Sequence, residues 1–281
     1  MFRSIATRSV PRILAVLSLL VVVAVTLDAQ SIPIASEADL KSALEKAPCK
    51  DEDRQAGVME LFTSVGAVGD AIITQKLGKI ENVIITKPGK SKETVIVGAH
   101  FDKTDDGCGV IDNWTGIVIL AKLYKTIMAL DTQKTFVFAA FAKEEKGLLG
   151  SSAMADNIPK EERANVCAMV NFDSFGFTYP QALGNVSDSS LVKLAQSISK
   201  DMKLPFASAE ISNASSDSAS FRAKKIPSIS LHGLDGRWQN YLHSNSDKLS
   251  NVNMQSVYIA YRHGLIMLSK IENSPCNTFR S

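Results

Sequence analysis

Residues able to bind a metal ion follow four strand-like apolar runs, each at or near the point where the run ends. The runs span residues 94–99, 136–142, 166–172 and 226–231, and the polar residues that follow them are His100, Glu144, Glu145, Asp173, His232 and His243. Short, continuous apolar runs are typical of the buried strands of a parallel sheet. In open α/β sheets, ligands bind at the carboxyl ends of the strands. The sequence therefore predicts one metal site where these strand ends meet.

Glu144 and Glu145 are adjacent carboxylates that follow one of these runs after a single lysine. Because adjacent side chains point in different directions, one can bind a metal ion while the other reaches a water on that ion. The cation lowers the pKa of the water and the nearby carboxylate takes its proton, which is the chemistry of metal-assisted hydrolysis. Taken without the other strand ends, the pair would be interpreted as a solvated charged turn.

Two aspartates near His100 are candidates for the same site. A metal-bound imidazole usually donates its other N–H to an oxygen, and Asp102 is a candidate for that acceptor. Asp112 closes a glycine-rich loop before an expected helix. It would either cap that helix or use its two oxygens to bridge two metal ions about 3.5–4 Å apart. Asp105 and Asp106 compete with it for the ligand role.

Two aspartates later in the chain are further candidates for a functional role. Asp173 closes a buried strand, where an unpaired charge is costly, and this favours a ligand role. Asp217 lies in a serine-rich segment at the start of an expected helix, where the helix dipole favours a carboxylate. Contact with a substrate is the functional alternative for Asp217. His263 lies in the expected C-terminal helix and is interpreted as structural.

The elements that must position these side chains alternate between strands and helices. A further strand is expected over 81–86, and helices over 36–46, 113–128, 147–155, 188–200, 215–223 and 251–270. Segment 58–77 is ambiguous and is interpreted as helix followed by irregular chain. The alternation predicts a doubly wound α/β fold. We expect a single-domain α/β/α sandwich with a mixed, mostly parallel central sheet and the metal site at the carboxyl ends of its strands.

The N-terminus, residues 1–29, has the features of an export signal. It combines a basic start with an apolar stretch of fifteen residues and a small residue, Ala29, at a suitable cleavage point. Fifteen residues fall short of the roughly 20 that a membrane-spanning helix needs. We therefore expect cleavage after Ala29, a catalytic domain over 30–281, a secreted or periplasmic location and no stable membrane insertion. An uncleaved N-terminal anchor is the alternative.

Charge and composition narrow the classes of partner. The chain has 281 residues and 45% hydrophobic content, enough for one substantial core. Its 31 basic and 29 acidic residues become 28 of each once residues 1–29 are removed. Because no basic patch stands out, nucleic acid and anionic membrane surfaces are not expected partners.

Four cysteines in an exported chain allow disulfide bonds. Cys167 lies inside an apolar run and is interpreted as a small buried hydrophobe. Cys49 and Cys276 flank the domain and are candidates to pair with each other. The spacing does not rank the three connectivities.

Six segments, read together, resemble the zinc exopeptidases of metallopeptidase family 28, the leucyl-aminopeptidase-like di-zinc group. The resemblance runs from about Glu81 to the C-terminus and rests on segments 98–102, 112–116, 141–151, 171–173, 216–221 and 243–247. Any one segment is a weak signal. All six in this order are a specific one.

The resemblance implies a ligand set for two zinc ions per chain. His100 and Asp173 would hold one ion, Glu145 and His243 would hold the other, and Asp112 would bridge them.

It also implies the remaining roles. Glu144 would be the general base that activates the bridging water, with Asp102 and Asp247 as supporting residues. The last ligand of the family is followed by Ser or Thr and then by Asp, which fits His243 and not His232. Tyr241, close to His243, is a candidate to stabilise the oxyanion.

The chain departs from the family pattern around the expected substrate pocket. Bulky Trp114 follows Asn113 where relatives have a small residue, and Cys108 lies in the preceding loop. We expect Trp114, Cys108 and Asp217 to contact substrate. For Cys108, half of a disulfide and a competing zinc ligand are the alternatives. Lys143 also replaces a small or apolar residue.

The leading hypothesis is a secreted zinc aminopeptidase acting on peptides with a free N-terminus. Glutaminyl cyclases, which resemble this chain at the Asp, Glu and His ligands but work with one zinc, are the alternative. They typically carry a tryptophan before the last histidine, where this chain has Leu242. A non-catalytic binding protein of the same fold is a third hypothesis. Loss of ligands would be its signature, and all five candidate ligands are present.

Overall fold

An eight-stranded sheet forms the centre of the computed structural model, which describes residues 32–210 and 214–280. The expected signal segment lies outside these residues. In chain order the strands are β1 (Ile72–Leu77), β2 (Ile80–Lys87), β3 (Thr94–His100), β4 (Thr135–Phe141), β5 (Val166–Phe172), β6 (Gln181–Leu183), β7 (Ser208–Ala209) and β8 (Ser228–His232). Their spatial order is β1-β2-β4-β3-β5-β8-β6-β7.

The four central strands are parallel and the flanking strands make the sheet mixed. β4, β3, β5 and β8 run in one direction, whereas β2 is antiparallel to β4 and β6 is antiparallel to β8. β5 is buried along its whole length, as a continuous apolar run predicts. The carboxyl ends of the four parallel strands therefore meet at one edge of the sheet.

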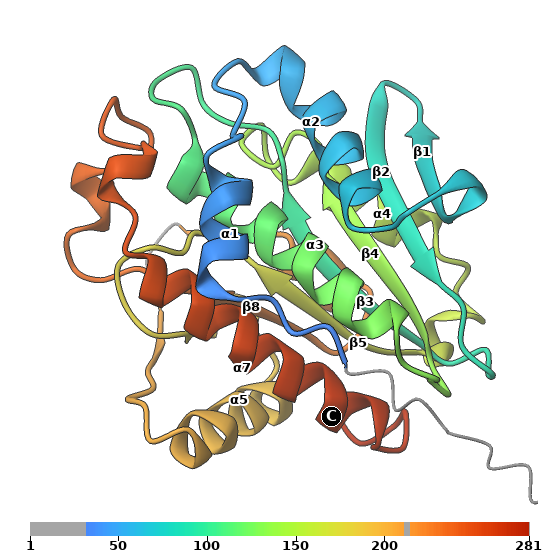
Figure 1. The fold of residues 1–281 in the computed structure, drawn as a ribbon. Helices are drawn as coiled ribbons and strands as arrows, with labels where there is room; N and C mark the ends of the chain where they lie inside the picture. The colour runs from blue at the N-terminus through green and yellow to red at the C-terminus, as the bar shows by residue number, and fades with distance from the viewer. Residues whose placement is uncertain (1–31, 211–213, 281) are drawn as a thin grey trace, which may run out of the picture. The chain divides into compact units, whose positions relative to one another are not determined.

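Seven α-helices cover the two faces of the sheet in the described residues (Figure 1). They are α1 (Glu37–Leu44), α2 (Asp51–Ser64), α3 (Thr115–Met128), α4 (Leu149–Asn157), α5 (Ser189–Asp201), α6 (Ser218–Arg222) and α7 (Met254–Glu272). The larger core lies on the face covered by α1, α2, α3, α5 and α7, and a smaller one lies under α4 and α6. The predicted α/β/α sandwich is confirmed. None of the described helices is both long and apolar enough to cross a membrane.

The ambiguous segment 58–77 contains the end of α2 and the whole of β1, so its second half is a strand and not irregular chain. β1 pairs only with β2 at the edge of the sheet. An edge strand is exposed on one side, which removes the continuous apolar run that identified the central strands.

The cysteines pair as Cys49–Cys108 and Cys167–Cys276. The suggested pairing of Cys49 with Cys276 is therefore wrong. Cys167 is buried, as predicted, but it is not a free hydrophobe, because the C-terminal tail runs past the beginning of β5 and brings Cys276 to it. Cys108 is likewise occupied by a disulfide that ties its loop to the chain just before α2.

Candidate metal centre

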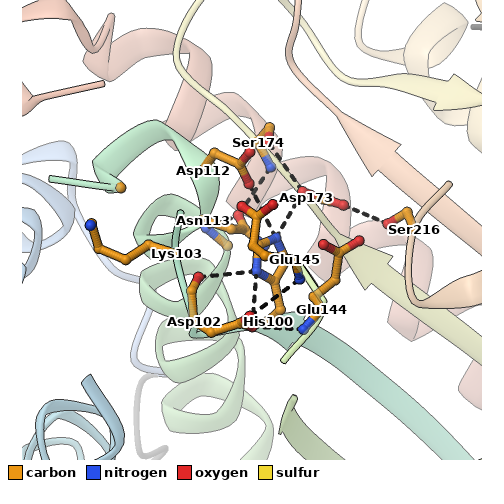
Figure 2. Close-up of polar contacts among 12 residues, drawn as sticks. His100, Asp102, Lys103, Asp112, Asn113, Glu144, Glu145, Asp173, Ser174 and Ser216 are labelled. Carbon is orange, nitrogen blue, oxygen red and sulfur yellow. Dashed lines mark hydrogen bonds and ion pairs between the residues drawn. The ribbon is translucent and has the colours of Figure 1, made fainter. Parts of the chain in front are cut away.

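The carboxyl ends of the central strands bring the predicted ligands together. His100 is the last residue of β3, Glu144 and Glu145 follow β4, and Asp173 follows β5. Figure 2 shows these side chains converging with Asp112 on one cluster. His243 joins them from the segment between β8 and α7.

Two triads of ligand atoms share Asp112. Nε2 of His100 lies 3.1 Å from Oδ1 of Asp112 and 3.4 Å from Oδ1 of Asp173. Nε2 of His243 lies 3.2 Å from Oδ2 of Asp112 and 3.2 Å from Oε2 of Glu145. Each oxygen of Asp112 therefore faces a different histidine, as a bridging carboxylate would.

These separations fit tetrahedral metal sites. Ligands about 2.0–2.1 Å from a zinc ion lie about 3.3 Å from one another at the corners of a tetrahedron, close to the 3.1–3.4 Å found here. Oε1 of Glu145 is buried and has no hydrogen-bond partner among the described residues. A donor set of imidazoles and carboxylates suits zinc and related divalent ions.

Asp102 supports the cluster in a different way from the one expected. Its carboxylate accepts hydrogen bonds from the backbone N–H groups of Glu144 (2.8 Å) and Glu145 (3.2 Å). The imidazole of His100 instead has its Nδ1 3.3 Å from the backbone carbonyl oxygen of Asp102, with the carboxylate 3.6 Å away. One residue thus orients His100 and both glutamates.

Asp112 does not cap the helix α3, and its backbone is instead held by Asp247. Asp247 accepts hydrogen bonds from the backbone N–H groups of Ile111 (2.6 Å) and Asp112 (3.0 Å). α3 begins only at Thr115, three residues after Asp112. The competing Asp105 and Asp106 are exposed, whereas Asp112 is buried.

Burial and crowding of carboxylates shift the pKa values in the cluster. Burial disfavours the charge on His100, but Glu144, Asp102, Asp112 and Asp173 outweigh it and raise the pKa of His100 well above its usual value. Hydrogen bonds that His243 donates to the carboxylates of Asp112 and Glu145 raise the pKa of His243 to about 10. Without a metal ion, these carboxylates therefore favour the protonated forms of both histidines.

Glu144 has its pKa raised to about 10, mainly by burial and further by the neighbouring carboxylates, against the opposing effect of His100. It lines the same cavity as the ligands but is not a member of either triad around Asp112. Bound cations would lower this pKa, and a carboxylate that keeps a high proton affinity beside a metal site can then act as a general base.

Asp217, expected to contact substrate, is fully buried and does not line the cavity. It lies at the start of α6, and neither of its oxygens has a hydrogen-bond partner among the described residues. Burial raises its pKa to about 7. The neighbouring Ser216 contacts the site instead, donating to Oδ2 of Asp173 at 2.5 Å (Figure 2).

The cavity over the cluster has a volume of about 370 Å³. Away from the charged cluster, large apolar side chains and small polar ones line its walls. The apolar part is formed by Leu183, Leu234, Trp238 and Leu242, and the polar part by His232, Ser174, Ser215, Ser216 and Ser230. Nδ1 of His232 accepts the backbone N–H of Leu234 at 3.2 Å, and burial lowers the pKa of His232 to about 4. His232 is thus a neutral wall residue.

Besides Asp217, three residues expected in the pocket lie elsewhere. Trp114 is 1% exposed and packs in the larger core, and Cys108 is in a disulfide. Tyr241 packs on the ring of Phe177, with centroids 5.0 Å apart, and does not line the cavity. Trp238, the aromatic wall of the cavity, was not predicted from the sequence. The available signal was a tryptophan in a loop shortly before the predicted ligand His243.

Comparison with known proteins gives consistent matches. The sequence model of peptidase family M28 matches residues 82–263. A "Probable leucine aminopeptidase" of Arthroderma otae is 34% identical over 196 residues, which cover 61% of this chain and 52% of that protein. The chain spans about half the length of the curated relatives it matches first.

Solved structures at lower identity share the fold. The LapA aminopeptidase of Legionella pneumophila superposes with a TM-score of 0.71 at 18% identity, covering 86% of this chain and 77% of that one. A zinc aminopeptidase from Bacillus subtilis gives 0.63 at 19% identity, covering 72% and 53%. The glutaminyl cyclase of Porphyromonas gingivalis gives 0.69 at 14% identity, covering 84% and 99%.

Proposed function

This chain belongs to peptidase family M28, and on that premise we propose that it is a zinc aminopeptidase that removes residues from the free N-termini of peptides. The observation that carries the proposal is the pair of ligand triads around Asp112, with Glu144 beside them. Relatives named as aminopeptidases and a neighbour named as a zinc aminopeptidase support it.

In this proposal His100, Asp112 and Asp173 hold one zinc ion, and Asp112, Glu145 and His243 hold the other. Bound zinc supplies Lewis-acid chemistry, lowering the pKa of water and polarising a carbonyl group. Glu144 takes the proton from the attacking water and later delivers it to the leaving amine. Asp102 keeps Glu144 in place through the hydrogen bond from its backbone N–H.

The rest of the cavity accounts for an exopeptidase acting at the N-terminus. In this proposal the α-amino group of the substrate lies at the end of the cavity where the charged cluster is, beside Glu144 and Glu145. The apolar wall of Leu183, Leu234, Trp238 and Leu242 is suited to an apolar side chain of the first residue. Apart from the proposed ligands and Glu144, no charged side chain of the described residues lines the cavity.

We also propose that the protein acts outside the cytosol, after removal of residues 1–29. The two disulfides support this, because such bonds persist in oxidising compartments.

The test is mass spectrometry of free, N-acetylated and glutamine-initiated peptides after incubation with the mature chain, with and without a chelator. We expect chelator-sensitive loss of the first residue from free N-termini only. Loss of ammonia from glutamine-initiated peptides, without cleavage, would instead establish a glutaminyl cyclase, the activity of a structural neighbour. No reaction with any peptide would leave a binding protein.

A further inference from the structure

Arg54 is a buried arginine that reaches the loop leading to Asp112. It lies in α2 with 0% of its surface exposed. Its Nη1 donates to the backbone carbonyl of Cys108 at 3.1 Å, and its Nη2 donates to that of Gly109 at 2.9 Å. The guanidinium thus holds two successive carbonyls just before the carboxylate that both triads share.

Trp114, the bulky departure from the family pattern, is the platform for this guanidinium. Cζ of Arg54 lies 5.1 Å from the centroid of the indole ring. A Cβ at Gly57 of α2 would lie 3.1 Å from the indole, and one at Gly109 would lie 2.5 Å from Nη1 of Arg54. Two glycines therefore leave the space that the stacked pair occupies.

The loop is held from both sides by opposite chemistry. Asp247 accepts the N–H groups of Ile111 and Asp112, while Arg54 donates to the carbonyls of Cys108 and Gly109. Burial lowers the pKa of Arg54 to about 10, with Asp247 and Asp112 opposing the shift, so the guanidinium stays charged at neutral pH.

We propose that Arg54 is a positioning residue of the metal centre: by fixing two loop carbonyls on the Trp114 platform, it holds Asp112 where both ions can share it. The proposal rests on the bridging role of Asp112 but not on peptidase activity. A planar fork that both stacks and donates in parallel is particular to arginine. Lysine would keep the charge and lose the fork.

The test is zinc affinity of the chelator-stripped protein, measured by competition with a chromophoric chelator. We expect Arg54→Lys and Arg54→Met to weaken zinc binding about tenfold or more, as is usual when a residue supporting a ligand is lost. Arg280→Met is the matched control. Arg280 also donates to backbone carbonyls, those of Val166 (2.6 Å) and Lys225 (3.1 Å), but away from the metal centre. Its zinc affinity should equal that of the wild type.

Thermal unfolding of the metal-free proteins separates positioning from general stability. A lowered melting temperature with wild-type zinc affinity in both Arg54 variants overturns the proposal. So does wild-type affinity in Arg54→Lys alone, because charge and not the fork would then suffice. If Arg54→Met does not fold, Trp114→Phe replaces it, because this change keeps the guanidinium but reduces the aromatic surface beneath it. Wild-type zinc affinity in both Trp114→Phe and Arg54→Lys would then overturn the proposal.

The outcome is independent of catalysis. If the wild-type chain binds zinc but cleaves no peptide, the proposed function is overturned. The measurement of zinc affinity still tests the role of Arg54 in that case. A wild-type chain that binds no zinc overturns both.

Discussion

The two ends of the central parallel strands are held by the same devices and differ in charge. At the carboxyl end, the Cys49–Cys108 disulfide and Arg54 hold the loop before Asp112. At the amino end, the Cys167–Cys276 disulfide and Arg280 hold the beginning of β5, Arg280 donating to the carbonyl of Val166. In both places a covalent bond and an arginine fix backbone carbonyls.

The two ends differ in the charges that lie beside their disulfide and arginine. At the carboxyl end the disulfide and the arginine hold together several buried carboxylates. Burial and the neighbouring carboxylates raise the pKa of Glu144, and attraction to the carboxylates raises the pKa values of His100 and His243. At the amino end the fixed partners are neutral carbonyls and a disulfide. We infer that the amino end serves stability alone, whereas the carboxyl end stores electrostatic repulsion that a metal ion relieves. Such local destabilisation is typical of functional sites.

The change expected to separate the two ends most sharply is Glu144→Gln. Loss of the general base should lower kcat by about 10²–10⁴-fold. Because burial and its neighbours hold Glu144 protonated at pH 7 without metal, the neutral amide should leave the melting temperature of the metal-free protein almost unchanged. The measurement pairs steady-state kinetics with thermal unfolding of the chelated protein.

Glu145→Gln is the control for this change. It removes a proposed ligand and should lose zinc as well as turnover, whereas Glu144→Gln should retain both ions. Turnover within tenfold of the wild type in Glu144→Gln would remove Glu144 from the role of base.

Proton release on metal binding tests the electrostatic difference between the two ends of the strands. Without metal, the raised pKa values of His100 and His243 favour the protonated forms of both side chains. Zinc must displace these protons, so its affinity should rise with pH, about tenfold per pH unit for each proton released. Calorimetry in buffers of different ionisation enthalpy counts the protons. Glu144, whose pKa is also raised, can contribute to this count. A binding enthalpy independent of the buffer would show that neither the histidines nor Glu144 release protons when zinc binds.

The carboxyl end was also the part of the molecule that the sequence predicted best. Buried parallel strands leave continuous apolar runs, and side chains just after such runs must meet at one edge of the sheet. This is why His100, Glu144, Glu145 and Asp173 were recognisable as a group. The choice of Asp112 over Asp105 and Asp106 needed either the family resemblance or the fold, since spacing alone did not separate them.

The rest depended on contacts between segments distant in sequence. Trp114 was expected in the pocket, but its packing on Arg54 follows from the path of α2, which no local pattern records. The disulfide partners are 59 and 109 residues apart and follow from the same long-range geometry. Short edge strands such as β7, with two residues, carry too little pattern to be recognised.

Removing each disulfide in turn tests whether the two ends serve different purposes. Either paired Cys→Ser substitution should lower stability by about 2–4 kcal/mol, because a long loop is no longer closed in the unfolded chain. Only Cys49→Ser with Cys108→Ser should also weaken zinc binding, because Cys108 belongs to the loop that Arg54 and Asp247 hold. The Cys167–Cys276 pair is the matched control. Equal zinc affinity in both double variants would mean that the carboxyl-end disulfide has no part in the metal centre.

The smallest effect concerns a histidine outside the metal centre, His263 in α7, which is fully buried. Burial lowers its pKa to about 4, although the hydrogen bond with the carbonyl of Ala195 opposes this. The unfolded chain, with a histidine pKa near 6.5, binds more protons than the folded one below that pH. This residue should therefore lower stability by about 2 kcal/mol between pH 7 and pH 5. His263→Gln, which can still reach Ala195 but does not titrate, should lose that part of the pH dependence in urea unfolding of the chelated protein. The proposed ligand histidines have raised pKa values, so their contribution to stability grows as the pH falls and opposes that of His263. An unchanged pH profile in His263→Gln would assign the acid sensitivity to groups other than His263.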